Sequence, residues 1–244
     1  MCWKLDMIKD KDGDLIRPSI FLGLPKTGGN AMIDYLQNFN PRRIGVSYGH
    51  HTYQNLVNLE SEIVEYGGVM NRKVYGIDEA HYFVTVRNPW DRMVSFWSYS
   101  RNFGTNIGAR FTEFKKKLVN GLSFSDFLNI VCNEKPIENE DNDNDLFRPQ
   151  IDYLVNDKNE VVIDDVLMLE DVKVNTDKML KKYISEETLN ELTGGDFKVI
   201  NNSNHLPYME YYNEDLIDMV YEYEKEIIDL MGYTFESHKQ PILN

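Results

Sequence analysis

Residues 19–30 read SIFLGLPKTGGN, and this stretch decides the fold that we expect for the chain. Residues 19–24 form a short apolar run that Pro25 ends, which is typical of a buried strand. Apolar side chains then recur at helical spacing over residues 30–39. The sequence therefore predicts a buried strand and a helix, joined by a turn that contains two glycines.

The same order of elements recurs further along the chain. Residues 82–86 (YFVTV) predict a second buried strand, and a helix follows from Pro89, with Asn88 placed to cap it. Residues 165–169 (DVLML) predict another strand, which a helix follows over residues 172–183. Because strands alternate with helices, we expect an α/β fold of three layers, with a central mostly parallel sheet flanked by helices. Further expected elements are an extended piece at residues 41–48 and helices over residues 52–66, 124–131, 186–192 and 214–231.

Length and composition bound the domain organisation. The 244 residues are 42% hydrophobic, which suits one packed domain over residues 1–244. Within it, we expect residues 1–18 to be an N-terminal extension and the acidic residues 134–145 to be an exposed loop. No secretory signal and no apolar run long enough to cross a bilayer is visible. The two cysteines, Cys2 and Cys132, cannot form a disulfide framework, so a cytoplasmic location is expected.

The formal net charge is −14, and the charge is unevenly distributed along the chain. Residues 1–122 hold 16 Lys and Arg against 12 Asp and Glu, whereas residues 123–244 hold 10 against 28. Nucleic acids and anionic membranes require clustered basic side chains, so the acidic excess argues against both as main partners. We expect a small anionic ligand to bind to the first half of the chain.

Candidate phosphate-binding residues lie in the turn after the first predicted strand. Gly28 and Gly29 let backbone N–H groups converge on an anion, and the start of the following helix adds positive potential. Lys26 supplies a cation inside the same turn. Because this lysine precedes the glycines, the Walker pattern of P-loop kinases is absent. The alternative interpretation is an ordinary strand–helix turn with an incidental lysine.

A second candidate anion site follows the second predicted strand. Arg87 leaves that strand at its C-terminal end, where open α/β sheets bind ligands. Ser95 lies two turns into the next helix, and a guanidinium with a hydroxyl suits a phosphate monoester. Asp91 and Arg92 have an alternative interpretation as cap and salt-bridge residues. The aromatic residues of this stretch are expected in the core: Trp90, Phe96 and Trp97.

Together, these two motifs resemble those of the PAPS-dependent sulfotransferases, where PAPS is 3′-phosphoadenosine 5′-phosphosulfate. The resemblance is to the branch with the carbohydrate sulfotransferases and their bacterial and viral relatives. Residues 25–29 (PKTGG) resemble the 5′-phosphosulfate loop of the family, and residues 87–95 resemble its 3′-phosphate motif. Residues 49–53 (GHHTY), 146–154 (LFRPQIDYL) and 202–233 are similar to further family segments. The resemblance implies a P-loop-like fold, PAPS as the donor and PAP, its desulfated form, as the product.

The resemblance also implies roles for individual residues. Lys26 would place a positive charge at the leaving phosphate, and His50 or His51 would be the base that takes the proton of the acceptor. The 3′-phosphate would be bound by Arg87 and Ser95, with Arg92 beside them. No metal ion is required, and no cysteine–histidine cluster has ligand spacing. The residues that would bind the 5′-phosphosulfate are Pro25, Lys26, Thr27, Gly28, Gly29 and Asn30.

Departures from the family pattern keep other interpretations open. Asn30 and Ala31 stand where the family has Thr or Ser, so a hydroxyl for the 5′-phosphate is missing. Leu146 stands where the family has His. A second interpretation is therefore a protein that binds PAP or another nucleotide but has lost transferase activity. A third, less favoured, is a P-loop kinase of a small metabolite.

The expected acceptor is a hydroxyl compound, a sugar or a small alcohol. The acidic residues 134–145 and the acidic final helix have a plain interpretation as solvated surface. The alternative interpretation is that they repel polyanions, which would disfavour heparin-like acceptors. The sequence leaves the sulfated position and the oligomeric state open.

Overall fold

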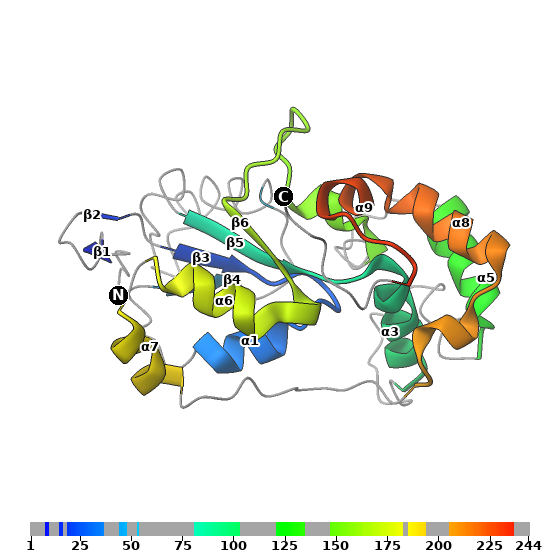
Figure 1. Cartoon of the computed structure of the whole chain (residues 1–244). Coiled ribbons are helices and arrows are strands. Elements are labelled where there is room, and N and C mark those ends of the chain that lie inside the picture. The colour runs from blue at the N-terminus through cyan, green and yellow to red at the C-terminus, as the bar shows by residue number, and fades with distance from the viewer. Residues whose placement is uncertain are drawn as a thin grey trace, which may run out of the picture. The chain divides into compact units, whose positions relative to one another are not determined.

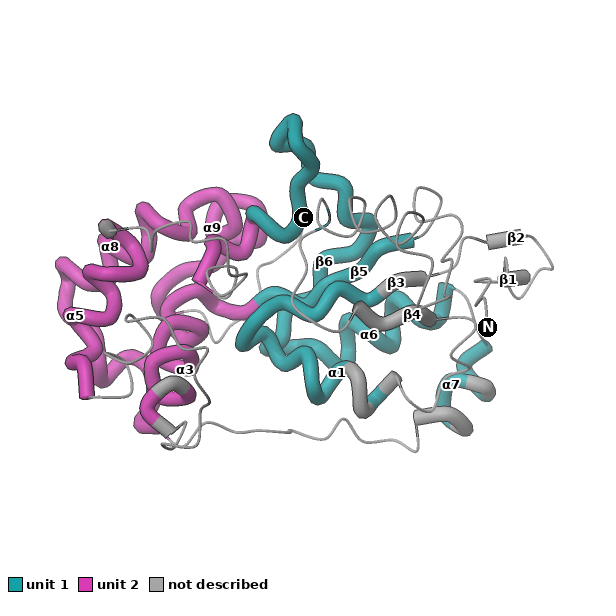
Figure 2. Tube along the Cα trace, turned by 180° about the vertical axis from the view of Figure 1, so that it is seen from behind, with its two compact units in different colours: residues 1–86, 152–201 teal, residues 87–151, 202–244 magenta. Residues whose placement is uncertain are grey.

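A computed structural model describes residues 8–9, 15–16, 19–36, 44–47, 53, 81–102, 121–134, 147–182, 185–193 and 205–236. The chain divides into two compact units (Figure 2). The first unit comprises residues 1–86 and 152–201, and the second comprises residues 87–151 and 202–244.

A parallel sheet of four strands forms the centre of the first unit (Figure 1). All neighbouring strands of this sheet run parallel. In the register of the sheet, Ser19 lies opposite both Ile44 and His81, and Phe83 lies opposite Asp165. The C-terminal ends of the strands therefore meet at one edge of the sheet. In order across the sheet, the strands are β4 (Ile44–Ser47), β3 (Ser19–Leu22), β5 (His81–Val86) and β6 (Asp165–Met168). Two shorter strands, β1 (Ile8–Lys9) and β2 (Leu15–Ile16), form a separate antiparallel pair.

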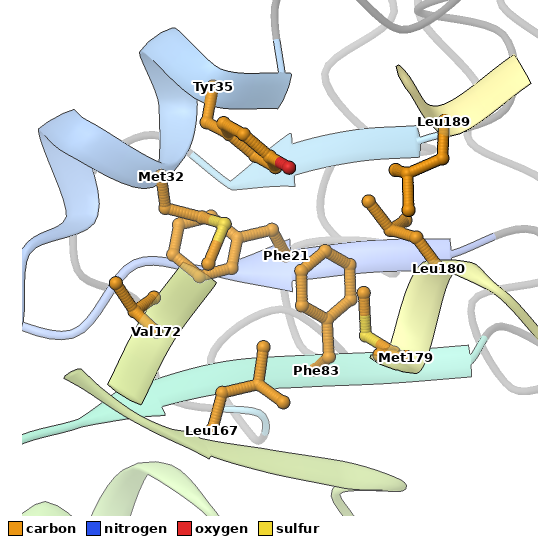
Figure 3. Close-up of a cluster of buried hydrophobic side chains, with 9 residues drawn as sticks. All are labelled: Phe21, Met32, Tyr35, Phe83, Leu167, Val172, Met179, Leu180 and Leu189. Carbon is orange, nitrogen blue, oxygen red and sulfur yellow. The ribbon is translucent and has the colours of Figure 1, made fainter. Parts of the chain in front are cut away.

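Helices cover one face of this sheet through a cluster of buried apolar side chains (Figure 3). The helical segments of the unit are α1 (Gly29–Leu36), a 3₁₀ turn at Leu169–Asp171, α6 (Val172–Leu180) and α7 (Glu186–Thr193). The cluster comprises Phe21, Phe83 and Leu167 from the strands, Met32 and Tyr35 from α1, Val172, Met179 and Leu180 from α6, and Leu189 from α7.

The central strand β5 is covered on both faces. All six of its residues are buried, although successive side chains of a strand point to opposite faces. On the face opposite Phe83, the ring of Tyr82 meets the ring of Tyr53 at a centroid distance of 5.2 Å. The predicted α/β fold, with a parallel sheet between flanking layers, is therefore confirmed.

The second unit is helical. It contains α3 (Pro89–Asn102), α5 (Phe124–Leu128), α8 (Glu214–Tyr223) and α9 (Lys225–Met231). A π-helical turn at Asn129–Glu134 continues α5, and 3₁₀ turns occupy Gln150–Tyr153, at the boundary of the units in sequence, and Tyr208–Tyr211.

The predicted start of α3 is confirmed. The Oδ1 atom of Asn88 accepts hydrogen bonds from the backbone N–H groups of Trp90 and Asp91, at 3.1 and 3.2 Å. Pro89 occupies the first helical position, where no N–H partner is needed. This cap fixes where the chain turns after β5 and so where Arg87, the residue between β5 and Asn88, is held.

The prediction of one continuous helix over residues 214–231 is wrong. The helix is interrupted at Glu224, whose φ of −109° and ψ of 16° are not helical. The side chain of Glu224 is buried and accepts hydrogen bonds from two groups of its own unit, the Arg92 guanidinium and the Gln150 backbone. We attribute the break to these contacts, which a pattern of apolar residues does not reveal. The predicted end at Gly232 is confirmed, since Gly232 has a φ of 68°.

Some predictions lie outside the described residues. They include the body of the helix expected over residues 52–66 and most of the acidic loop expected over residues 134–145. Over the part of the chain that the structure describes, no helix is both long and apolar enough to cross a membrane.

Candidate functional site

The glycine-containing turn, here called the β3–α1 loop (residues 23–28), begins at the C-terminal edge of the parallel sheet. Thr27 fastens this loop to the neighbouring strand. Its buried hydroxyl donates a hydrogen bond to the Leu24 carbonyl at 3.0 Å and lies 3.2 Å from the hydroxyl of Thr85 on β5. The hydroxyl of Thr27 therefore shapes the loop, and the backbone is the part of this residue that suits a ligand.

The backbone of the loop is tightly curved. Lys26 and Gly28 both have positive φ angles, 65° and 80°, in the left-handed region that side chains disfavour. A Cβ atom at Gly28 would also lie 2.4 Å from the Cδ1 atom of Leu169. The positive φ angle and the close approach of the Leu169 side chain therefore both favour glycine at position 28.

Helix α1 begins directly after the loop. Its first backbone hydrogen bond runs from the N–H of Met32 to the carbonyl of Gly28, at 3.0 Å. The N–H groups of Gly29, Asn30 and Ala31 precede that bond, and no acidic residue occupies the first turn of α1. Together, the amides, the helix dipole and the lysine fit the charge of a phosphosulfate.

Arg87 is the first residue after β5. Its Nε and Nη2 atoms lie 2.9 and 2.8 Å from the Oδ2 atom of Asp91, which is in the first turn of α3. The side chain of Arg87 is 16% exposed. One carboxylate oxygen thus holds one edge of a partly exposed guanidinium, which fixes the orientation of its plane.

The backbone of Arg87 is held as firmly as its side chain. Its N–H donates to the Oε1 atom of Gln150, and its carbonyl accepts from the Nε2 atom of Gln150, each at 2.9 Å. Gln150 is fully buried. One side-chain amide therefore satisfies both backbone groups of the arginine.

Arg92 has a different environment from Arg87. Its side chain is fully buried, and its Nη1 atom lies 2.6 Å from the Oε1 atom of Glu224, which is equally buried. Its Nη2 atom donates to the Arg148 carbonyl at 3.1 Å, and its guanidinium lies 4.9 Å from the centre of the Phe96 ring. These contacts fit the salt-bridge interpretation of Arg92.

The remaining residues of the motif are buried in α3. Ser95 is 2% exposed and lies one turn beyond Arg92, on the same side of the helix. The expectation that the aromatic residues of this stretch belong to the core is confirmed, since all are buried: Trp90, Phe96 and Trp97.

The predicted site residues fall into two described groups and one group outside the description. The loop residues 25–30 belong to the first unit, whereas Arg87, Arg92 and Ser95 belong to the second. His50 and His51 lie outside the described residues. Among the residues that are described, no group of three or more His, Cys, Asp or Glu side chains could hold a metal ion.

The sequence did not single out Gln150, which holds the backbone of Arg87, or Glu224, which pairs with Arg92. Gln150 belongs to the RPQ segment at residues 148–150, where family resemblance was the available signal. Glu224 is one of 28 acidic residues in the second half of the chain, so nothing in its surroundings marks it. Gln150 lies 63 residues after Arg87, and Glu224 lies 132 residues after Arg92. Only folding brings each pair together.

Comparisons with known proteins define the class to which this fold and these motifs belong. The chain matches the sulfotransferase family over residues 20–223 and belongs to that family. The family membership and the enzyme class predicted from the two motifs are therefore confirmed.

Among solved structures, the chain is similar to mouse sulfotransferase SULT7A1 complexed with PAP, at 14% sequence identity and a TM-score of 0.45. That match covers 94% of this chain and 92% of the mouse chain. No curated protein matches the chain in sequence.

Proposed function

We propose that the protein transfers the sulfuryl group of PAPS to a hydroxyl of an acceptor, with a carbohydrate as the favoured acceptor class, and releases PAP. The observation that carries this proposal is the β3–α1 loop of a sulfotransferase-family chain. In this loop, Lys26 and Gly28 both have positive φ angles. The backbone N–H groups that open α1 follow directly after Gly28. This arrangement suits an anion of high charge.

The β3–α1 loop and α1 would stabilise the charge that develops during transfer. When bound, PAPS supplies the sulfuryl group that is displaced in line from its phosphate onto the acceptor hydroxyl. The backbone N–H groups of Gly28, Gly29 and Asn30 would bind the 5′-phosphate, with Pro25 and Thr27 shaping the loop around them. The ammonium of Lys26 would neutralise the oxygen that bridges phosphorus and sulfur, where negative charge accumulates.

Arg87 and Ser95 would bind the 3′-phosphate, the group that distinguishes PAPS from ATP. Support comes from the fixed plane of the Arg87 guanidinium beside Asp91, since a forked donor binds a phosphate best when it is oriented in advance. Because the charge of Arg92 is already paired with Glu224, we propose that Arg92 supports this site from within the protein.

The acceptor hydroxyl must lose a proton, and a histidine has the ordinary pKa for that task. We propose His50 or His51 as the base, on the resemblance of residues 49–53 to the family segment. No metal ion is needed in this scheme, because a lysine and backbone amides supply the electrostatic stabilisation. The exposed acidic residues of α8 favour a neutral sugar or small alcohol over a polyanion: Glu214, Asp215, Asp218 and Glu222.

A second candidate function is nucleotide binding without transfer. It is favoured by one observation: the first turn of α1 presents an exposed Asn30 followed by a buried Ala31, with no hydroxyl at either position. Two experiments separate the candidates. Calorimetry with PAP, ATP and ADP tests the donor site, and tight binding of PAP with negligible binding of ATP would exclude a kinase. Transfer of labelled sulfate from PAPS to any member of a glycan panel would exclude an inactive binder.

A further inference from the structure

We infer that Gln150 and Glu224 are positioning residues that aim Arg87 and thereby select a nucleotide with a 3′-phosphate. The inference rests on the proposed function, because it assumes that Arg87 binds that phosphate. It goes further by naming residues that touch neither the nucleotide nor the acceptor. All of the contacts that carry it lie within the second unit.

Gln150 holds the backbone of Arg87 through two hydrogen bonds. Arg87 follows the last residue of β5 and precedes Asn88, the cap of α3, so it belongs to neither element. The amide of Gln150 donates to its carbonyl and accepts from its N–H, both at 2.9 Å. Two hydrogen bonds from one planar group fix the position and the rotation of the arginine backbone, and hence the direction of its side chain.

Glu224 in turn holds Gln150 in place. The backbone N–H of Gln150 donates to the Oε2 atom of Glu224 at 2.8 Å, while the Oε1 atom of Glu224 lies 2.6 Å from the Nη1 atom of Arg92. Arg92 stands on α3, five residues after Arg87. The contacts therefore run from the Arg87 backbone through Gln150 and Glu224 back to α3. The side chains that make them, those of Gln150, Glu224 and Arg92, are all buried.

The helical segment formed by α8 and α9 is interrupted at Glu224. Apart from this residue, a continuous helix would run from Glu214 to Met231, as the sequence pattern predicts. At the break, the carboxylate reaches both Gln150 and Arg92 with one oxygen each. Both carboxylate oxygens of Glu224 thus hold a neighbouring group, which is the pattern expected of a residue that orients its neighbours.

A phosphate bound by a guanidinium fork is sensitive to direction. Two parallel N–H···O bonds form only when the plane of the guanidinium faces the anion, so a small rotation of the arginine backbone weakens both bonds. Loss of the Gln150 amide would release that rotation while leaving Arg87 and its charge in place. We therefore expect the change to affect recognition of the 3′-phosphate more than binding of the rest of the nucleotide.

The test compares PAP with adenosine 5′-phosphate, which lacks the 3′-phosphate, by isothermal titration calorimetry. The full chain is used as the wild type and as the variants Gln150→Met, Arg87→Ala and Tyr223→Phe. Gln150→Met keeps the length of the side chain and removes both hydrogen bonds. Tyr223→Phe is the matched control, because it removes a hydrogen bond from a tyrosine hydroxyl to the Phe147 carbonyl in the same unit. The readout is the ratio of the two dissociation constants.

We expect the wild type to bind PAP far more tightly than adenosine 5′-phosphate, and Arg87→Ala to lose most of that preference. Gln150→Met should reduce the preference about tenfold or more, the loss expected from one charge-assisted phosphate contact. Its affinity for adenosine 5′-phosphate should stay within about twofold of the wild type. Tyr223→Phe should keep the wild-type preference.

The outcomes separate this inference from the proposed function. A wild type with no preference for PAP would overturn the donor site itself. A clear preference in the wild type that Arg87→Ala abolishes and Gln150→Met keeps would overturn the positioning role while the donor site stands.

If Gln150→Met does not fold, Gln150→Glu decides the question in the same assay. Its carboxylate still accepts from the Arg87 N–H but no longer donates to the Arg87 carbonyl. An unchanged preference for PAP in a folded Gln150→Glu protein would overturn the inference.

Discussion

Substitution of Gly28 by alanine is the sharpest test of the β3–α1 loop. The variant adds one methyl group at the residue before α1. Gly28 has a φ of 80°, and the added Cβ atom would lie 2.4 Å from the Cδ1 atom of Leu169. Leu169 is partly buried against the cluster of the first unit, so the end of its side chain must turn away from the added methyl group.

The cost of the Gly28→Ala variant has three contributions. The left-handed backbone costs an alanine about 1–2 kcal/mol relative to glycine. Turning the partly buried Leu169 side chain out of its rotamer costs about 0.5–1.5 kcal/mol more. Alanine also reduces the conformational freedom of the unfolded chain, which stabilises the folded protein by about 0.4–1 kcal/mol. We therefore expect the free energy of unfolding to fall by about 1–3 kcal/mol, with a melting temperature lower by about 2–10 °C.

Two other glycines serve as matched controls in a denaturant-unfolding assay. At Gly121 the φ is 94° but no atom lies within 4 Å of an added Cβ, so Gly121→Ala isolates the backbone cost and should lose about 1 kcal/mol. At Gly29 an added Cβ would lie 3.8 Å from the Cα atom of Gly23, an ordinary contact, so Gly29→Ala should keep the wild-type stability. A Gly28→Ala protein as stable as Gly29→Ala would refute the reasoning.

Two further predictions concern buried groups of the second unit. Glu224→Ala would leave the Arg92 guanidinium charged and buried without its carboxylate, so the free energy of unfolding should fall by about 3–5 kcal/mol. The double variant Arg92→Met with Glu224→Met should lose less than Glu224→Ala, as measured by denaturant unfolding, and a larger loss would contradict this account. Burial and the nearby charge of Glu224 raise the pKa of the Cys132 thiol from 9.0 to about 12. The folded protein thus binds the thiol proton more tightly than the unfolded chain, so this contribution to stability is complete below about pH 9 and is lost as the pH rises toward 12. At pH 8, alkylation of Cys132 measured by peptide mass spectrometry should be far slower in the folded protein than in denaturant, and equal rates would contradict the raised pKa.

The sequence predicted the elements whose signal is local. The strands at residues 19–24, 82–86 and 165–169 are short, apolar and bounded by turn residues, and each has its counterpart in β3, β5 and β6. The cap of α3 was equally visible, because Asn88 and Pro89 are adjacent and act on the next few residues. The positions of the candidate site residues at the ends of β3 and β5 follow from the same local pattern.

The elements that the sequence did not predict depend on contacts between distant residues. Glu224 sits inside an amphipathic pattern and has the composition of a surface residue, yet it is 1% exposed and interrupts the helix. Its burial follows from Arg92, which lies 132 residues earlier and carries the opposite charge. Helical periodicity reports which face of a segment is apolar, and it does not report which single charge turns inward to meet a partner.

Transfer of labelled sulfate from PAPS to a panel of sugars and small alcohols tests the central claim most directly, when it is measured for the wild type beside Lys26→Ala. The account predicts a sulfated product with the wild type and a rate lower by about 10²–10³-fold with Lys26→Ala, because a preorganised cation at the leaving oxygen is lost. Calorimetry with PAP should confirm that the variant still folds and binds nucleotide. Undiminished transfer by Lys26→Ala would contradict the account.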